Sequence, residues 1–176
     1  MADDFSDDVT TTGVALIGGS VTGRIEPAPA IDRDWFAVDF LGGTWYEVPI
    51  TGAGQPGQAL VDPYLSGIHD AAGSLLPNSI SDDIILGIER DSHLLFQAPA
   101  TGRHYLSVGS FFEPNDAVLH GTDYALSVSL APVLLGGGGG RLAGLATRRW
   151  HCRRRRGARH DLVHQRRHAR RCNSRE

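Results

Sequence analysis

The sequence predicts an all-β protein: an antiparallel, jelly-roll-like β-sandwich followed by a basic tail without regular structure. Two observations predict the sandwich, because apolar residues recur at alternate positions in short runs, and Gly, Pro, Asn and Asp separate these runs. The change of composition after Gly140 predicts the tail. We therefore expect a sandwich domain at residues 1–131, a glycine-rich linker at 132–140 and an unstructured arginine-rich tail at 141–176.

The alternation predicts short strands throughout the first part of the chain and no helix. In DWFAVDF, Phe36, Val38 and Phe40 fall on one face of a strand and are expected in the core, whereas Trp35 and Ala37 fall on the opposite face. Stretches such as TGAGQPGQ and PATG have the composition of turns. The predicted strands are Val14–Ile17, Ser20–Ile25, Asp34–Phe40, Trp45–Ile50, Pro63–His69, Ile84–Ile88, His93–Ala98, Arg103–Ser110 and Asp123–Leu130.

Charge divides the chain into two parts of opposite sign. Up to Gly140 there are 18 acidic residues against four arginines, and beyond it 13 arginines against two acidic residues. The first part contains no lysine, and it has no cysteine from which a disulfide scaffold could be built. This composition is typical of an extracellular bacterial protein in calcium-containing medium, and we expect a secreted monomer. No stretch approaches the roughly 18 consecutive apolar residues that a membrane-spanning helix needs.

Four segments of the first part carry a resemblance by their order and spacing. They are DRDWFAVDFLGGTWYEV (32–48), LVDPYLSGIHDAAGSLL (60–76), DSHLLFQAPATGRHYLSVGS (91–110) and GTDYALSVSL (121–130). Together they resemble the bacterial pre-peptidase C-terminal domain family, β-sandwich modules attached to secreted peptidases and to RTX-type, or hemolysin-type, calcium-binding repeat proteins. The resemblance covers about residues 3–131. It implies a non-catalytic accessory domain that assists the secretion, folding or targeting of an attached peptidase or repeat region.

The resemblance also bears on export. The N-terminal residues MADDFSDDV lack the basic and then apolar pattern of a secretory signal peptide. We therefore expect no Sec-type signal at this end, and the resemblance implies type I-like export as a route in relatives.

Acidic residues cluster in three places of the first part, and calcium is the cofactor that they suggest. Calcium takes about 6–8 oxygen ligands, mostly carboxylates and backbone carbonyls in loops. The resemblance implies a calcium site between the acidic N-terminal segment and the turn before DWF, although Asp-Asp pairs stand here where relatives carry a Glu-Asn-Asp type of segment. A solvated acidic rim without a specific site is the alternative. The candidate ligands are Asp3, Asp4, Asp7, Asp8, Asp32, Asp34, Asp82 and Asp83.

Enzymatic motifs are missing from the first part, and we expect no catalytic activity. It has no HExxH pair, no GxSxG elbow and no cysteine nucleophile. Asp91, Ser92 and His93 are neighbours in sequence, but successive strand residues point to opposite faces and cannot converge as a triad. His104 is expected on the surface of a strand.

An extracellular binding module for polysaccharide or a matrix protein is the alternative function. Such a module would present a row of exposed aromatic side chains on one sheet face, whereas burial of these side chains would favour the accessory role. The candidates are Trp45, Tyr46, Tyr64, Phe111 and Phe112.

Three interpretations of the tail remain open. A GC-rich gene for glycine- and aspartate-rich calcium-binding repeats, read out of frame, encodes arginine-rich sequence such as RRRRGARHD, so the tail fits a frameshifted repeat array. An arginine arm would bind phosphates or anionic lipid, although a lysine-free arm with one aromatic residue predicts no specific nucleic-acid partner. The third interpretation is a zinc site, whose candidate ligands lie four residues apart, as on one face of a helix. These are His160, His164, His168 and Cys172.

Overall fold

The computed structural model describes residues 3–86 and 88–132 of the chain. The predicted linker beyond Pro132 and the whole arginine-rich tail, with its three interpretations, lie outside the described residues. Within the described residues, no helix is long and apolar enough to cross a membrane.

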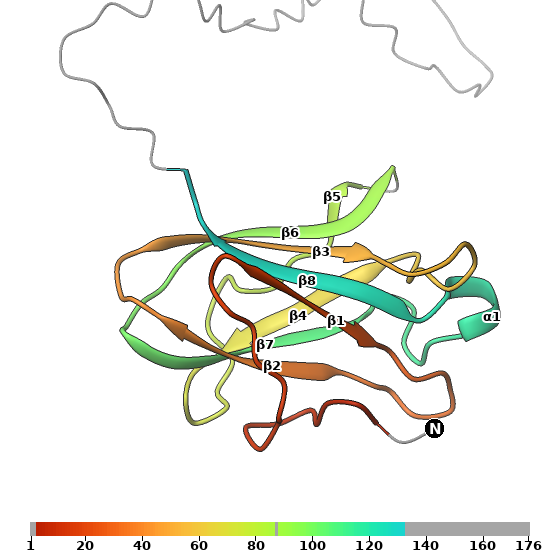
Figure 1. Ribbon diagram of the computed structural model, residues 1–176, viewed down its shortest axis with the longest axis horizontal. Helices are drawn as coiled ribbons and strands as arrows, with labels where there is room; N and C mark the ends of the chain where they lie inside the picture. Colours follow the sequence, from red (N-terminus) through yellow and green to blue (C-terminus); the bar gives the residue numbers. More distant parts are fainter. Residues whose placement is uncertain (1–2, 87, 133–176) are drawn as a thin grey trace, which may run out of the picture. The chain divides into compact units, whose positions relative to one another are not determined.

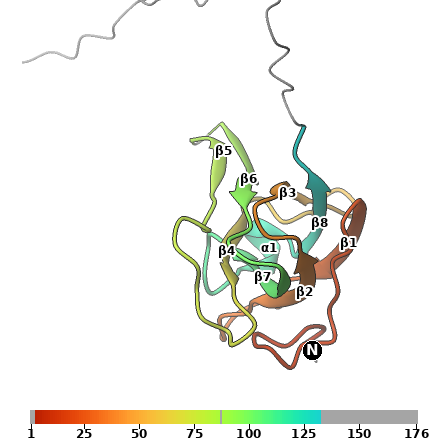
Figure 2. The same ribbon diagram turned by 90° about the vertical axis from the view of Figure 1, so that its left-hand side faces the viewer.

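The described residues form an antiparallel β-sandwich, which confirms the predicted fold class. A five-stranded sheet in the order β1-β8-β3-β6-β5 packs on a three-stranded sheet in the order β2-β7-β4 (Figure 2). The elements are β1 Gly19–Arg24, β2 Asp34–Phe40, β3 Trp45–Gly52, β4 Pro63–His69, β5 Asp83–Ile85, β6 Glu89–Gln97, β7 Gly102–Ser110, α1 Ala117–His120 and β8 Asp123–Leu130.

The core lies between the two sheets. Phe36, Val38 and Phe40 are buried in it, as the alternation of β2 predicts. Trp35 and Ala37, on the opposite face of β2, are buried as well, in a second cluster that includes Tyr105. The ring of His69 lies 4.0 Å from that of Trp35, so a neighbouring side chain covers this outer face. Both faces of β2 are therefore shielded from solvent.

The predicted strand Val14–Ile17 does not form. Val14 makes an isolated bridge to Ala37 of β2, and Ile17 makes one to Val128 of β8. The amide of Ala37 donates to the Gly13 carbonyl at 2.9 Å, and a side chain at Gly13 would collide with the Trp35 carbonyl, so this segment lies directly against β2. The segment closes the β2 edge and then crosses to the five-stranded sheet.

The β4 edge of the three-stranded sheet is closed in a similar way. Leu65 and Ser81 exchange two backbone hydrogen bonds of 3.0 Å each, and His69 bridges Leu75. The segment from Leu75 to Ser81 then continues into β5 of the other sheet. Each edge of the three-stranded sheet therefore carries a crossing segment. The first crossing segment is residues 13–17 at the β2 edge, and the second is residues 75–81 at the β4 edge.

Two other local predictions differ from the structure. The expected strand Ile84–Ile88 is reduced to the three residues of β5, whose isoleucines are about half exposed, because the chain turns back into β6 at once. The four-residue helix α1 was not predicted, since it buries no side chain and shows no apolar periodicity. Asp116 caps it by accepting a hydrogen bond from the Val118 amide at 3.0 Å.

The starts of β2 and β4 lie at the same end of the sandwich. Both strands run antiparallel to β7, and Asp34 and Leu65 are both paired with Val108. Helix α1 lies at this end too, on the right of Figure 1.

Candidate metal centres

A first group of carboxylates gathers where the N-terminal segment passes the start of β2. The Trp35 amide donates to the Ser6 carbonyl at 3.3 Å, and the ring of Phe5 packs 4.7 Å from that of Phe36. These contacts bring Asp3 and Asp4 beside β2. Carboxylate oxygens of Asp3, Asp4 and Glu26 lie within 4.8 Å of one another, and so do those of Asp3, Asp32 and Asp34. We call these five residues the N-terminal acidic cluster.

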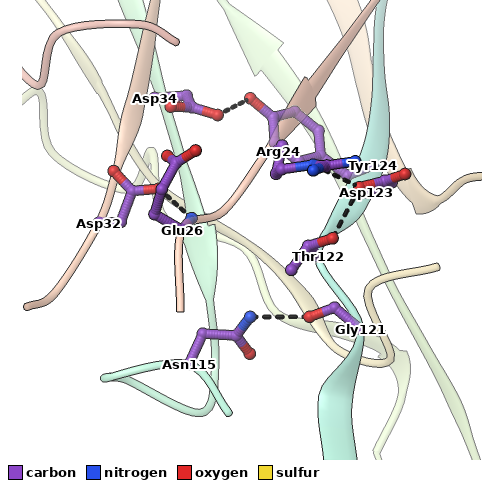
Figure 3. Close-up of polar contacts among 9 residues, drawn as sticks. All are labelled: Arg24, Glu26, Asp32, Asp34, Asn115, Gly121, Thr122, Asp123 and Tyr124. Carbon is purple, nitrogen blue, oxygen red and sulfur yellow. Dashed lines mark hydrogen bonds and ion pairs between the residues drawn. The ribbon is translucent and has the colours of Figure 1, made fainter. Parts of the chain in front are cut away.

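Asp34 is the deepest member of this cluster. It is fully buried, and its Oδ2 accepts a hydrogen bond of 2.5 Å from the hydroxyl of Tyr124 on β8 (Figure 3). Its Oδ1 has no hydrogen-bond partner among the described residues. Burial raises the pKa of Asp34 to about 9, since the ionised form loses its hydration. Gly23 on β1 makes room for this pair, because a side chain there would collide with the Tyr124 hydroxyl.

Glu26 and Asp32 form the second layer of the cluster. They lie in the connection from β1 to β2, where the Glu26 amide donates to Asp32 Oδ2 at 2.6 Å (Figure 3). Burial, followed by the hydrogen bond to Asp32 and the neighbouring negative charges, raises the pKa of Glu26 to about 7. Burial also raises the pKa values of Asp32 and Asp4. The cluster therefore favours either protons or a cation among its oxygens.

A second group of carboxylates lies at the β4 edge. Oxygens of Asp62, Asp82 and Asp83 come within 4.8 Å of one another, and we call them the β4–β5 acidic cluster. Asp62 directly precedes β4 and is buried, while Asp82 and Asp83 are half-buried at the start of β5. The Oδ1 atoms of Asp62 and Asp82 have no hydrogen-bond partner among the described residues. Burial, then the charges of Asp83 and Asp82, raise the pKa of Asp62 to about 6.

One guanidinium group faces this second cluster. Arg90 Nη1 lies 3.6 Å from Asp62 Oδ2, and the same guanidinium lies 5.8 Å from the centre of the Phe112 ring. The ring of His120 stacks on Phe112 at 3.9 Å between centroids. Phe112 therefore holds Arg90 beside the cluster.

The structure brings together six of the eight predicted ligands and adds two. Asp7 and Asp8 belong to neither cluster. Asp8 Oδ1 accepts hydrogen bonds from the amide and the hydroxyl of Thr10, at 2.7 and 2.6 Å, which lowers its pKa and makes it a turn cap. Glu26 and Asp62 were missed because each is a single acidic residue in its stretch of sequence, without a neighbouring acidic residue to mark it.

The residues considered for catalysis do not converge. Ser92 is fully buried and donates to the Ser81 carbonyl at 3.1 Å, whereas its neighbour His93 is exposed on the other face of β6. The surface position expected for His104 is wrong. Its side chain is buried, because Nδ1 bonds the Gly102 carbonyl at 2.9 Å and the ring packs 5.3 Å from that of Phe40.

The candidate aromatic residues do not form a row on one face. Tyr46 is buried in the core, whereas Trp45 and Phe111 are about half exposed. Trp45 starts β3 just after the turn that ends β2, and Phe111 follows the end of β7 beside the start of β2. The two exposed aromatic side chains thus lie at opposite ends of the sandwich, which is an unfavourable arrangement for one polymer-binding surface.

Comparisons with known proteins give similarities of fold at low sequence identity. No protein-family model matches the chain, and no curated protein matches it significantly in sequence. The chain is similar to the pre-peptidase C-terminal domain of a collagenase from Bacillus anthracis, with 13% identity, coverage of 66% of this chain and 92% of that chain, and a TM-score of 0.47. It is also similar to a periplasmic inhibitor of g-type lysozyme from Aeromonas hydrophila, with 13% identity, 66% and 97% coverage, and a TM-score of 0.36. At these values the likenesses assign the chain to no family, and the description of the fold depends on its own strands and sheets.

Proposed function

We propose that the β-sandwich is a non-catalytic accessory domain of a secreted bacterial protein, and that calcium at the N-terminal acidic cluster stabilises it outside the cell. In this proposal the domain assists the secretion, folding or targeting of an attached peptidase or repeat region. One observation carries the calcium site: the fully buried Asp34 belongs to a group of five carboxylates, and no donor group in the described part of the chain bonds its Oδ1.

The chemistry of the cluster supports calcium as the ion. All the side chains are carboxylates, which favour a hard cation, and calcium accepts an irregular set of about 6–8 oxygens. Asp3 and Asp4 are exposed, so an ion has access from solvent and water can complete its coordination. The neighbouring Arg24 is engaged in an ion pair with Asp123 at 3.0 Å. A bound divalent ion would compensate the negative charge of the cluster.

Calcium at this cluster would act as a clamp on the N-terminal segment. Asp3 and Asp4 come from that segment, whereas Asp34 is the first residue of β2 and Asp32 lies just before it. An ion shared between them would fasten the segment to the edge of the sheet. Calcium is scarce in the cytosol and abundant outside the cell, so the clamp would close only after export.

Thermal unfolding in calcium tests this proposal. An ion that binds the folded state alone adds RT ln(1 + [Ca]/Kd), which is about 1.5–2.7 kcal/mol in roughly 10 mM calcium for the ~0.1–1 mM affinities of extracellular modules. We expect the melting temperature to rise by about 4–10 °C. Limited proteolysis should also cut the N-terminal segment more slowly in calcium than in chelator.

Matched ions and variants provide the controls. Sodium at equal ionic strength measures screening, and magnesium measures divalent charge without the same coordination. Asp32→Asn should remove most of the calcium effect, whereas Glu47→Gln, on the outward side of β3, should leave it intact. If calcium stabilises no more than magnesium does, or if Asp32→Asn responds like the unchanged protein, the proposed site does not exist.

A further inference from the structure

We propose that the β4–β5 acidic cluster is a second site for a hard divalent cation, independent of the first, and that its ion fastens the second crossing segment to the start of β4. The proposal goes beyond the function above, which places calcium at the N-terminal acidic cluster alone. It uses different ligands on a different strand edge, so either site can exist without the other.

Asp62 gives the site a fixed ligand. Its side chain is 7% exposed, and its backbone carbonyl accepts a hydrogen bond from the Phe111 amide at 3.0 Å. Pro63, the first residue of β4, follows directly and restricts the backbone. The carboxylate therefore has a defined position before any ion arrives.

The other two ligands, Asp82 and Asp83, directly follow the second crossing segment, whose position is also fixed. Ser81 exchanges two backbone hydrogen bonds with Leu65 of β4. Its hydroxyl donates to the His93 carbonyl at 2.9 Å, and its own carbonyl accepts from the Ser92 hydroxyl at 3.1 Å. Because Ser81 is held from both sheets, Asp82 and Asp83 are brought against Asp62 by the fold itself.

The balance of charge and hydrogen bonds points to an ion rather than to a structural ion pair. Two buried oxygens of cluster residues, Asp62 Oδ1 and Asp82 Oδ1, have no hydrogen-bond partner within residues 3–86 and 88–132. Arg90 approaches Asp62 at 3.6 Å, which is long for a charge-assisted hydrogen bond, and about two fifths of its side chain is exposed. Oxygen ligands alone select calcium or a similarly hard ion.

The two sites are far enough apart to be separable. Asp34 of β2 and Leu65 of β4 are paired with the same residue of β7, so two strand spacings, roughly 10 Å, separate the two edges. That distance is about one Debye length at physiological salt, so we expect ions at the two sites to bind nearly independently.

A calcium titration of the full chain, followed by NMR, tests the second site by position. The amides of residues 81–83 report on the β4–β5 acidic cluster, and those of residues 4–6 report on the N-terminal acidic cluster. We expect both groups of signals to shift in the unchanged protein. Asp62→Asn should remove the calcium-dependent shifts at 81–83 and preserve those at 4–6, and Asp32→Asn should do the reverse.

Arg90→Gln keeps the test decisive even if Asp62→Asn folds poorly. Removing the competing positive charge should tighten binding at residues 81–83 by about threefold to tenfold, an effect that loss of structure cannot produce. Three outcomes would each overturn the proposal. The signals at 81–83 of the unchanged protein could fail to respond to calcium, or they could shift as much in Asp62→Asn as in the unchanged protein. Arg90→Gln could also bind calcium more weakly than the unchanged protein does. If calcium shifts the amide signals of residues 81–83 but not those of residues 4–6, the result would instead contradict the proposed function.

Discussion

The two edges of the three-stranded sheet are built in the same way but carry different charges. At each edge a pair of aspartates from outside the edge strand, Asp3 and Asp4 or Asp82 and Asp83, shares a carboxylate cluster with a buried aspartate at or just before the first residue of that strand. At the β2 edge the buried Asp34 receives a neutral hydroxyl, that of Tyr124. At the β4 edge the buried Asp62 faces the guanidinium of Arg90. A similar backbone arrangement therefore creates two carboxylate clusters, of which only the one at the β4 edge has its negative charge partly neutralised by an arginine described in contact with it.

The two buried aspartates also differ in pKa, mainly because of burial, which is the largest cause of the raised pKa of each, while the charge of Arg90 contributes less. The pKa of Asp34 is raised to about 9, whereas that of Asp62, beside Arg90, is raised to about 6. The N-terminal acidic cluster also has five carboxylates against three at the other edge. We therefore expect the β2 edge to depend more strongly on protons or calcium than the β4 edge does.

The largest expected effect is the pH dependence of the calcium-free protein. A carboxyl whose pKa is higher in the fold than in the unfolded chain stabilises the fold fully below its unfolded pKa, and this stability is lost as the pH rises through the folded pKa. Asp62, Glu26 and Asp34 should lose theirs in turn, up to about pH 6, 7 and 9. Between about pH 5 and pH 9 we expect the free energy of unfolding to fall by at least about 3 kcal/mol, since each pKa unit corresponds to about 1.4 kcal/mol, and urea denaturation in chelator measures this fall.

Calcium and Asp34→Asn should both reduce this pH dependence. Calcium competes with protons for the same oxygens, and asparagine cannot ionise, so either change should flatten the curve above about pH 7. Asp62→Asn should flatten only its lower part, near pH 6, where Asp62 titrates. A stability that rises between pH 5 and 9 in chelator would contradict the comparison of the two edges.

Gly23→Ala should give the next largest effect and should act on the β2 edge alone. The added methyl group would collide with the Tyr124 hydroxyl and press on Asp34. We expect a loss of about 2 kcal/mol in chemical denaturation, because a packed core tolerates an extra methyl group poorly. Calcium-dependent shifts should weaken at residues 4–6 and persist at 81–83. Equal weakening at both positions would mean that the two clusters are not separable.

A pair of conservative substitutions should give the smallest effects and rank the two edges directly. Tyr124→Phe removes the hydrogen bond from the Tyr124 hydroxyl to the fully buried Asp34 and should cost about 1–2 kcal/mol in calcium-free buffer. Arg90→Gln removes a long, partly exposed ion pair and should cost at most about 0.5 kcal/mol. Both values come from urea denaturation at neutral pH. The reverse order would show that Arg90 matters more to its edge than Tyr124 does.

Local sequence predicted the strands wherever alternation and turns coincide. The bounds of β2, β4 and β8 agree with the predicted ones, because each is an alternating run between turn residues. Val14–Ile17 is a continuous apolar run that also predicts a strand, but its residues bridge first one sheet and then the other, and that crossing is decided by the packing of the sheets. A local apolar pattern alone does not distinguish a strand that pairs along its length within one sheet from a segment that crosses between two sheets.

The candidate metal centres were predictable only in part, for a similar reason. Asp32 and Asp34 are two residues apart, and Asp82 and Asp83 are adjacent, so the sequence itself marks them. Glu26 becomes a neighbour of Asp3 only when the N-terminal segment lies along β2. Asp62 meets Asp82 only when the second crossing segment closes the β4 edge. Such ligands are set by tertiary contacts, which no short motif records.

The pairing of β1 with β8 has a consequence for the order of folding. The first strand finds its partner at the far end of the domain, and Ser20 Oγ donates to the Leu126 carbonyl across 106 positions of the chain. Since β8 lies between β1 and β3, the larger sheet remains in two pieces until the last strand has been synthesised. Such non-local closure slows folding. The five-stranded sheet can therefore be completed only when β8, up to Leu130, is available to join β1 to β3.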